Sequence, residues 1–369
     1  MSVCFVIDRL SRAGTETQLL ALIRHLDRSR VRPTLCLLNG NDDETRSLLP
    51  ADCPTIDLQL PRLLSPRSAV AAARVVRFWK RHRTDVVQTY LTDSSYFAIP
   101  LARAAGIRSA VRVRNNLGYF LTPLDRRVGR WVGKMATVSL SNSEEGVRAL
   151  ADAERLHPDR VRCMPNGVDL GRFRPEPRPG DGTVRVGAVA NLRPVKDIAG
   201  LVRAAAVLCP RYPHLRFEVA GEGSERPALE EQIRAAGLAN RFMLAGACAD
   251  VPAFLAGLDV AVLCSRSESM SNALLEYMAA GRPVVATDVG ASARIVRHGR
   301  EGWVIPPGDV TELAAAIERY VRNPELARAH GRAGRSRAEA EYGRPAMVRR
   351  FEDFFESLRA GAARGPRRV

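Results

Sequence analysis

Short apolar runs rich in valine, isoleucine and leucine alternate along the chain with longer stretches in which apolar residues recur every three or four positions. The first pattern is typical of buried strands and the second of helices that pack on one face. In the first half it predicts strands at 3–7, 33–38, 55–60, 85–89, 109–113, 136–140 and 161–164, and helices at 15–26, 68–81, 94–105 and 125–134. Buried strands joined by helical crossovers indicate a parallel sheet that is covered on both faces.

A turn-rich segment interrupts this pattern near the middle of the chain. Pro165-Asn166-Gly167-Val168-Asp169 leads into a Pro- and Gly-rich stretch at 174–182, which predicts a domain boundary. The pattern then restarts, with strands expected at 184–189, 217–220, 242–244, 260–264 and 283–287, and helices at 198–208, 227–236 and 272–280. We therefore predict an α/β protein with two Rossmann-like domains, residues 1–168 and 169–345, that face each other across a cleft.

Bulk properties narrow the class of protein. The length of 369 residues is comfortable for two domains, and 46% hydrophobic with 26% charged residues is typical of a globular protein. The first residues predict a strand and not a signal peptide, and no apolar run approaches the roughly 18 residues of a membrane span. Seven cysteines without CxxC spacing fit neither a disulfide framework nor a zinc site. We expect a cytoplasmic protein.

Positive charge is concentrated in the first half of the chain. Between Arg62 and Lys134 there are 15 basic and 3 acidic residues, whereas 24 basic and 21 acidic residues lie between Asp169 and Arg344. We expect the basic region to attract an anionic membrane surface, which would make the protein peripheral on the inner face. On the helix at 68–81, Arg74, Arg77 and Arg81 would face out, whereas the apolar residues would face the sheet. Solvated arginines that reflect arginine-rich coding are the alternative, since the chain has only three lysines.

One loop and helix in the second half carry the most informative chemistry. The segment from Ser265 to Glu276 follows an apolar strand, and Ser271 or Asn272 is placed to cap the helix that follows. The first amides of that helix and its positive dipole end suit a diphosphate. Glu268 lies in the loop and Glu276 on the second turn, so one carboxylate can reach a sugar while the other holds a ribose diol.

A second cluster opens the same half, again between a strand and a helix. Arg193 and Lys196 flank Pro194, which restricts the turn. A diphosphate leaving group gains negative charge as its bond breaks, and a paired Arg and Lys can stabilise it without a metal ion. The alternative is an ordinary basic loop.

These motifs resemble a known family. The segment from Glu268 through SNALLEYMAAGRPVVATDVG to Gly290 resembles the signature of the family-4 retaining glycosyltransferases of group 1, which have the GT-B fold. Arg193 and Lys196 match that family's donor-phosphate pair, and 165–169 matches its interdomain PNGVD. Gly14, with Thr15 and Glu16, resembles its glycine loop near the donor phosphates and acceptor.

The resemblance implies specific roles. Arg193, Lys196 and Glu268 would be the catalytic residues, with the first two on the diphosphate and Glu276 on the ribose hydroxyls. Glu268 and the amides after it would hold the transferred sugar; the donor-binding set is Gly14, Arg193, Lys196, Glu268, Ser271, Asn272, Ala273, Leu274 and Glu276. The donor is a nucleotide-sugar, with a UDP-sugar favoured and a GDP-sugar as the alternative, and no cofactor or metal is expected. A last helix at 346–360 would cross back to the first domain, before a basic tail at 361–369.

The acceptor side departs from the family. Many relatives carry histidines after the fourth and fifth strands, where this chain has residues 88–90 and 112–116. Retention needs no histidine base if the departing phosphate takes the acceptor proton. Asp93, Arg112, Arg114 and Asn115 are the candidates for recognising the acceptor, which we expect to be a glycan or a lipid-linked molecule.

Three other classes of protein compete with this interpretation. Only Gly14 stands where a dinucleotide enzyme would have GxGxxG. A nucleotide-sugar epimerase on the same double fold would release free nucleotide without any acceptor. A nucleic-acid-binding protein would need an aromatic platform that the basic region lacks, so we expect no nucleic acid partner.

Overall fold

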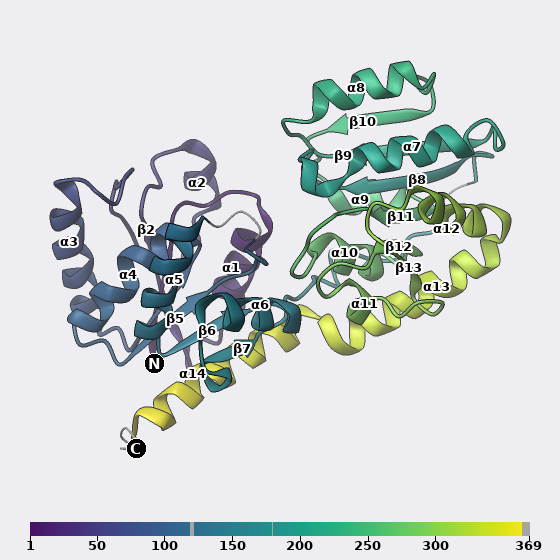
Figure 1. Cartoon of the computed structure of the whole chain (residues 1–369). Helices are drawn as coiled ribbons and strands as arrows, with labels where there is room; N and C mark the ends of the chain where they lie inside the picture. Colours follow the sequence, from purple (N-terminus) through teal and green to yellow (C-terminus); the bar gives the residue numbers. More distant parts are fainter. Residues whose placement is uncertain (119–121, 179, 364–369) are drawn as a thin grey trace. The chain divides into compact units, whose positions relative to one another are not determined.

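The computed structural model describes residues 1–118, 122–178 and 180–363, with side chains described up to residue 359. The chain forms two compact units (Figure 1). Unit 1 contains residues 1–166 and the C-terminal segment from Pro345, and unit 2 contains Gly167–Arg344. The chain leaves unit 1 two residues before the predicted boundary at 168, and it returns at Pro345.

Unit 1 is built on a seven-stranded sheet in the order β3-β2-β1-β4-β5-β6-β7, in which every pair is parallel. Its strands are β1 Ser2–Ile7, β2 Arg32–Leu37, β3 Thr55–Asp57, β4 Val86–Tyr90, β5 Ser109–Val113, β6 Val138–Ser141 and β7 Val161–Cys163. Its helices are α1 Gly14–His25, α2 Asp43–Leu48, α3 Arg67–Arg81, α4 Thr92–Ala104, α5 Pro123–Met135, α6 Glu144–Glu154 and α14 Arg344–Ala363, which begins on the last residue of unit 2. The prediction missed α2 and α6.

Unit 2 repeats the same arrangement with a six-stranded parallel sheet in the order β10-β9-β8-β11-β12-β13. Its strands are β8 Val184–Val189, β9 Leu215–Ala220, β10 Phe242–Gly246, β11 Val260–Leu263, β12 Val284–Thr287 and β13 Gly302–Ile305. Its helices are α7 Ile198–Leu208, α8 Arg226–Ala235, α9 Val251–Ala256, α10 Asn272–Ala279, α11 Ser292–Ile295, α12 Val310–Arg322 and α13 Pro324–Arg337. The prediction had no element for α9, β13 or α11 to α13.

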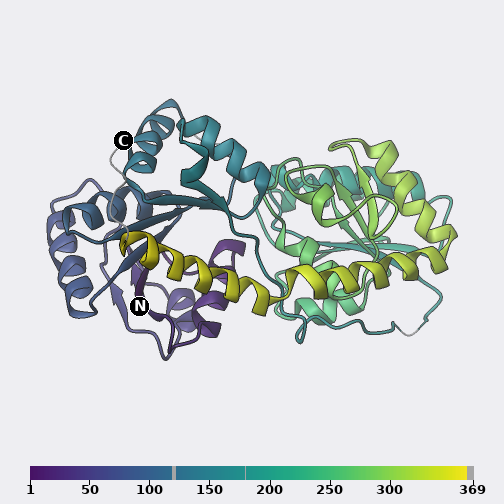
Figure 2. The same ribbon diagram turned by 90° about the horizontal axis from the view of Figure 1, so that it is seen from below.

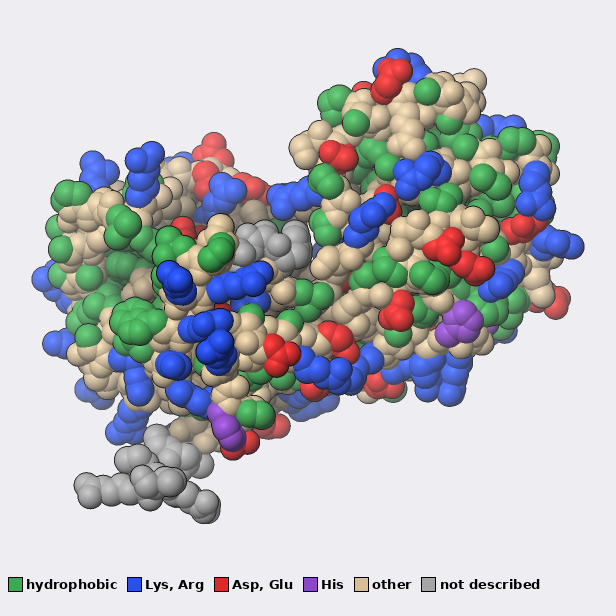
Figure 3. Space-filling model, viewed as in Figure 1, with side chains coloured by type: hydrophobic (Ala, Val, Ile, Leu, Met, Phe, Trp, Pro, Cys, Tyr) green, Lys and Arg blue, Asp and Glu red, His purple; other side chains and the backbone are tan. Residues whose placement is uncertain are grey.

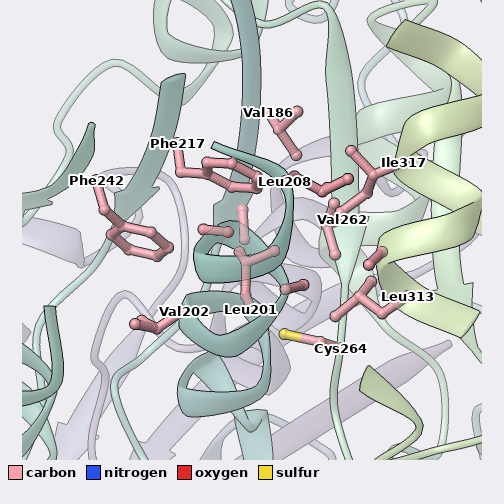
Figure 4. Packing of buried hydrophobic residues seen from close by; sticks show 14 of the residues in the cluster. Val186, Leu201, Val202, Leu208, Phe217, Phe242, Val262, Cys264, Leu313 and Ile317 are labelled. Carbon is pink, nitrogen blue, oxygen red and sulfur yellow. The ribbon is translucent and has the colours of Figure 1, made fainter. Parts of the chain in front are cut away.

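The main core of unit 2 lies between the sheet and the helices α7 and α12. Val186, Phe217 and Val262 point from the strands toward Leu201 of α7 and Ile317 of α12 (Figure 4). The rings of Phe217 and Phe242 stack with their centroids 5.8 Å apart. This core fixes the ends of β8 and β11, from which the predicted site segments leave.

The C-terminal helix α14 packs on the sheet of unit 1. Figure 2 shows it beside the N-terminal strand and α1, and its apolar face (Met347, Val348, Phe351, Phe354 and Phe355) is buried in one core with Phe5 and Leu19. Arg30 pairs with three carboxylates of α14, those of Glu352, Asp353 and Glu356. Among the described residues, no helix is long and apolar enough to cross a membrane.

Candidate functional site

The predicted segments of the second half leave two neighbouring strands of unit 2. β8 and β11 lie side by side, while the chain continues from β8 to β9 on one side and from β11 to β12 on the other. Parallel sheets of this kind bind ligands beyond the carboxyl ends of their strands, at such a change of direction. The loop with Arg193 and Lys196 follows β8, and the loop with Glu268 follows β11.

Direct contacts join these two loops. Lys196 Nζ donates to Glu268 Oε1 at 2.5 Å, and the Ser265 hydroxyl donates to the same oxygen at 2.9 Å. The Arg266 amide donates to the Val195 carbonyl at 2.7 Å. Both charged side chains are largely covered, with 25% of Lys196 and 14% of Glu268 exposed. The structure thus brings Lys196 and Glu268, which are 72 residues apart in sequence, into one ion pair.

Asp197 holds the first loop in an uncommon backbone conformation. Its φ of 47° and ψ of 40° lie in the left-handed region, and its carboxylate accepts from the Gly200 amide at the start of α7. The guanidinium of Arg266, from the other loop, lies 3.0 Å from the same carboxylate. Strained residues of this kind persist only where the surroundings hold them, and they are common at functional sites.

The helix α10 presents its N-terminus at the same edge of the sheet. Ser271 is the N-cap, and its hydroxyl accepts from the Leu274 amide at 3.4 Å. The amide of Leu274 thus faces the cap, and its side chain is buried in the core. The first amides of an α-helix have no acceptor within the helix itself. Buried Tyr277 fixes α10 against β8, because its hydroxyl accepts from the Val189 amide at 2.7 Å.

Glu276 lies one turn into α10 and is half-buried. Burial raises the pKa of its carboxyl to about 7, although the positive charges of Arg172 and Arg344 act in the opposite direction. Arg193, in contrast, is exposed at the start of its loop. The predicted donor residues of unit 2 thus gather at one edge of its sheet, and a shallow groove beside β10, lined by Arg216 and Met243, contains none of them.

A loop that the sequence analysis missed supports the Arg193 segment. Gly221 to Glu225 follow β9, and the backbone of Leu192 exchanges hydrogen bonds with Glu222 and Glu225 at 2.9 and 3.0 Å. A Cβ atom at Gly223 would lie 2.2 Å from the Leu192 carbonyl oxygen, so only glycine permits this approach. The signal was available, since a Gly-x-Gly sequence directly follows a strand.

In unit 1, Gly14 begins α1 and Asp93 lies exposed on the first turn of α4. The sequence analysis missed Asp8, which follows β1 and accepts a hydrogen bond from the Ser94 amide at 2.8 Å. Burial raises the pKa of Asp8 to about 6. In this sheet the chain continues from β1 and from β4 in opposite directions. Asp8 and Asp93 therefore occupy the position in unit 1 that the predicted donor residues occupy in unit 2.

The structure corrects the interpretation of Arg112 and Arg114. Both guanidinium groups are buried and pair with the buried carboxylate of Glu154, at 2.6 and 2.9 Å. They therefore stabilise the packing of β5 on α6 and do not present a free surface to an acceptor. Asn115, the next residue along, is half-buried and lines a small cavity with Tyr90 and Ser141. Of the acceptor-side candidates, only Asp93 and Asn115 keep exposed surface.

Comparison with known proteins identifies the family. The model for glycosyl transferases group 1 matches residues 183–323, and the model for glycosyltransferase family 4 matches residues 12–172. The chain belongs to the family-4 glycosyltransferases of group 1. This confirms both the predicted family and the predicted enzyme class, a glycosyltransferase.

Curated relatives cover most of this glycosyltransferase. It is 27% identical over 302 residues to 2-deoxystreptamine glucosyltransferase of Streptomyces kanamyceticus, covering 74% of this chain and 78% of the relative. It is also 27% identical over 359 residues to D-inositol 3-phosphate glycosyltransferase of Pseudarthrobacter chlorophenolicus, covering 89% and 83%.

Solved structures share its fold. The crystal structure of Anabaena HepE in complex with UDP superposes with a TM-score of 0.84, at 21% identity over 97% of this chain and 100% of that one. Sucrose-phosphate synthase from Thermosynechococcus elongatus gives a TM-score of 0.83, at 20% identity over 98% and 99%. The glycosyltransferase therefore has the predicted GT-B fold of two Rossmann-like domains. In the part of the chain that the structure describes, no three His, Cys, Asp or Glu side chains gather as a metal site would require.

Proposed function

We propose that this glycosyltransferase transfers a sugar, with retention of its anomeric configuration, from a nucleoside-diphosphate sugar to a glycan or lipid-linked acceptor in cell-surface polysaccharide or glycolipid synthesis. The observation that carries the proposal is the Lys196–Glu268 pair, 2.5 Å apart beside the capped N-terminus of α10. A cation, a carboxylate and a helix N-terminus at one point suit a ligand with an anionic part and a hydroxyl-rich part.

Each group has a role in this proposal. Arg193 and Lys196 bind the diphosphate, together with the first-turn amides of α10. When the phosphates bind Lys196 in place of Glu268, the carboxylate of Glu268 can accept hydrogen bonds from the sugar hydroxyls. Glu276 accepts from the ribose diol.

The proposed chemistry uses the leaving group as the base. As the bond between sugar and phosphate breaks, negative charge grows on the phosphate oxygen, and Arg193 and Lys196 stabilise that charge. The same oxygen takes the proton of the acceptor hydroxyl, which attacks from the same face of the sugar. This route needs no histidine, and the two cations supply the charge that a divalent metal would supply.

The choice of donor draws on structures of the same fold. Those of Anabaena HepE contain UDP, UDP with glucose, or UDP-glucose. They support a UDP-sugar as the first donor to test, with a GDP-sugar as the second. Relatives named for lipopolysaccharide core and exopolysaccharide enzymes support a surface-glycan acceptor.

The test begins with a thermal-shift panel of UDP, GDP, ADP and CMP and their sugars. A ligand at a hundred times its Kd adds about 2.7 kcal/mol of stability, which is readily measured. The sugar donor identified in this way is then incubated with candidate acceptors, and NMR coupling constants give the anomeric configuration of the product. An inverted product would contradict retention. Release of free nucleotide and an altered sugar without any acceptor would instead identify an epimerase.

We also propose that the enzyme works in the cytoplasm and on the inner face of a membrane, where a lipid-linked acceptor is held. The support is the uneven charge, with 15 basic and 3 acidic residues between Arg62 and Lys134. The structure of α3 shows which part of this helix could contact a membrane. Val75 and Trp79 are buried against the unit, so the apolar side of this helix does not face outward.

A further inference from the structure

The helix α5 exposes apolar side chains that the fold does not cover. Leu124 is 68% exposed and Trp131 is 57% exposed, whereas Val132 of the same helix is fully buried. Leu124, Arg127, Trp131 and Lys134 recur at intervals of three or four residues and therefore share one side of the helix. With Arg126 and Arg130 they form what we call the α5 face.

The inner side of α5 explains why these residues cannot turn inward. Gly129 and Gly133 lie against the carboxylate of Glu154, and a Cβ atom at either position would meet a Glu154 oxygen at 2.9 or 2.7 Å. That carboxylate is held in turn by Arg112 and Arg114. A capping box between Thr122 and Asp125 fixes the first turn. The rotation of α5 about its axis is thus determined by buried contacts.

The charges on the α5 face have few partners. The helix carries Arg126, Arg127, Arg130 and Lys134 against a single acidic residue, Asp125, which is engaged in the capping box. Among the ion pairs of the described residues, none involves these four cations; Arg130 donates to the Ala153 carbonyl. Figure 3 shows unit 1 from the side on which α5 lies in Figure 1, with basic side chains beside apolar ones.

The surroundings indicate an extended anionic surface and not a small acidic ligand. Further exposed cations lie on α3 and α4 and the loops that follow them: Arg67, Arg77, Lys80, Arg81, Arg83, Arg103 and Arg108. The acidic residues between Arg62 and Lys134 are only three, and Asp85 is already hydrogen bonded to the Ser2 amide. Positive charge spread over several elements, with an indole and a leucine at one place, suits a membrane of anionic lipid, because tryptophan favours the interface and arginine the headgroups.

We propose that the α5 face is the surface by which this enzyme docks on an anionic bilayer, with Trp131 and Leu124 entering the interface and the four cations contacting lipid headgroups. This inference deepens the proposed function, because it names the partner surface for the proposed membrane association. α3 was expected to contribute charge alone, and α5 adds an apolar contact to it. Basic residues near an anionic leaflet each strengthen binding about fivefold.

The test measures co-sedimentation of the full chain with vesicles of phosphatidylcholine alone and with 30% phosphatidylglycerol. The wild-type protein should bind only the anionic vesicles, and binding should weaken steeply as salt is raised. The double variant Leu124→Ser/Trp131→Ser should lose most of this binding. The triple variant R126E/R127E/K134E should lose on the order of a hundredfold, about fivefold for each cation.

Matched controls come from unit 2. Val207 on α7 is 52% exposed, a fraction similar to that of Trp131. Arg328 and Arg332 are exposed on α13. V207S and R328E/R332E should bind anionic vesicles as the wild type does. A second readout uses tryptophan fluorescence, because Trp79 is buried and Trp303 is partly covered. Anionic vesicles should shift the emission to the blue in the wild type, and W131F should still bind while losing that shift.

Several results would overturn the inference: no binding at low salt, equal binding to neutral vesicles, or undiminished binding of both α5 variants. Stabilisation by UDP, measured on the same proteins, separates this inference from the proposed function. Variants of α5 that keep the UDP shift are folded and retain their donor site. A wild type that binds vesicles but no nucleotide would refute the donor proposal and leave the docking surface intact.

Discussion

Gly290 lies directly against the backbone of Glu268. A Cβ atom at position 290 would lie 2.1 Å from the Glu268 carbonyl oxygen and 2.6 Å from that of Ser269. The two residues come from the loops after β12 and β11. The φ of Gly290 is also positive, at 51°. The position of the Glu268 loop therefore depends on the absence of a side chain at residue 290.

We expect Gly290→Ala to displace the Glu268 loop and reduce both donor affinity and turnover. Gly237→Ala is the matched control, since Gly237 also has a positive φ, 68°, but its Cβ would meet nothing within 4 Å. Left-handed strain should cost both variants about 1–2 kcal/mol of stability, measured by denaturation, and the clash at position 290 should add to the loss in Gly290→Ala. Only Gly290→Ala should lose UDP binding. If the two variants bind UDP equally well, the contact does not position the site.

The Arg193 and Lys196 side chains give the second prediction. Replacing either by alanine should lower turnover by about a hundredfold or more, because each is proposed to stabilise charge that grows in the transition state. Arg193 is exposed, so thermal unfolding of R193A should change little, whereas K196A also loses its ion pair with Glu268 and should be somewhat less stable. Arg234→Ala, an exposed arginine paired with Glu231 on α8, serves as the control. Near-normal turnover in both site variants would remove the pair from the mechanism.

The local structure around the proposed donor residues was predictable because its signals are local. Around Glu268 a strand, a loop, a capping serine and a helix follow one another within about 20 residues, and the structure keeps that order. The contact between Lys196 and Glu268 could be expected only from the topology, since strands β8 and β11 must first become neighbours.

The interactions of the candidate residues in unit 1 were not predictable in the same way, because their partners lie far away in the sequence. Arg112 and Arg114 were predicted to face an acceptor, yet Glu154, whose one carboxylate pairs with both, lies about 40 residues along on a helix that the pattern did not predict. That helix, α6, begins Glu144-Glu145-Gly146 and has only two large apolar residues, Val147 and Leu150, so its pattern is short. Asp8 follows a strand as an ordinary polar residue, and its hydrogen bond to Ser94 spans 86 positions.

The buried group of Glu154, Arg112 and Arg114 gives the third prediction. Glu154→Gln should destabilise unit 1 by about 3–5 kcal/mol, the typical effect of leaving a buried charge without its partner, since Arg112 and Arg114 are only 5% and 6% exposed. Asp152→Asn, an exposed residue on the same helix, should change stability by less than about 0.5 kcal/mol. Urea unfolding measures both. Equal stability of the two variants would mean that the guanidinium groups find other partners.

The fourth prediction is that turnover does not require a divalent metal. Arg193 and Lys196 supply the positive charge in the proposed mechanism, so treatment with EDTA should leave the rate within about twofold, far less than the hundredfold effect of losing a charge-stabilising donor. Added magnesium or manganese should not raise it further. Loss of activity in EDTA, followed by recovery with either ion, would contradict the proposal.

The last prediction concerns Glu276, whose pKa is raised by burial from 4.5 to about 7. An acid with a higher pKa in the folded chain holds its proton more tightly there, so between about pH 4.5 and 7 unfolding releases a proton. The free energy of unfolding must then fall as the pH rises through this range, and the loss is complete above pH 7. Glutamine carries no charge, so Glu276→Gln should match the wild type near pH 4.5 and exceed its Tm at pH 8.

Donor binding should respond in the opposite direction, because an ionised carboxylate accepts stronger hydrogen bonds from ribose hydroxyls. Wild-type affinity for UDP should therefore increase from pH 6 to pH 8, and that of Glu276→Gln should be weaker and less dependent on pH. Glu325→Gln, an exposed residue at the start of α13, controls for the general effect of losing a carboxylate. Thermal shifts with and without UDP across this pH range measure both effects, and a Tm difference that does not change with pH would place the titration elsewhere.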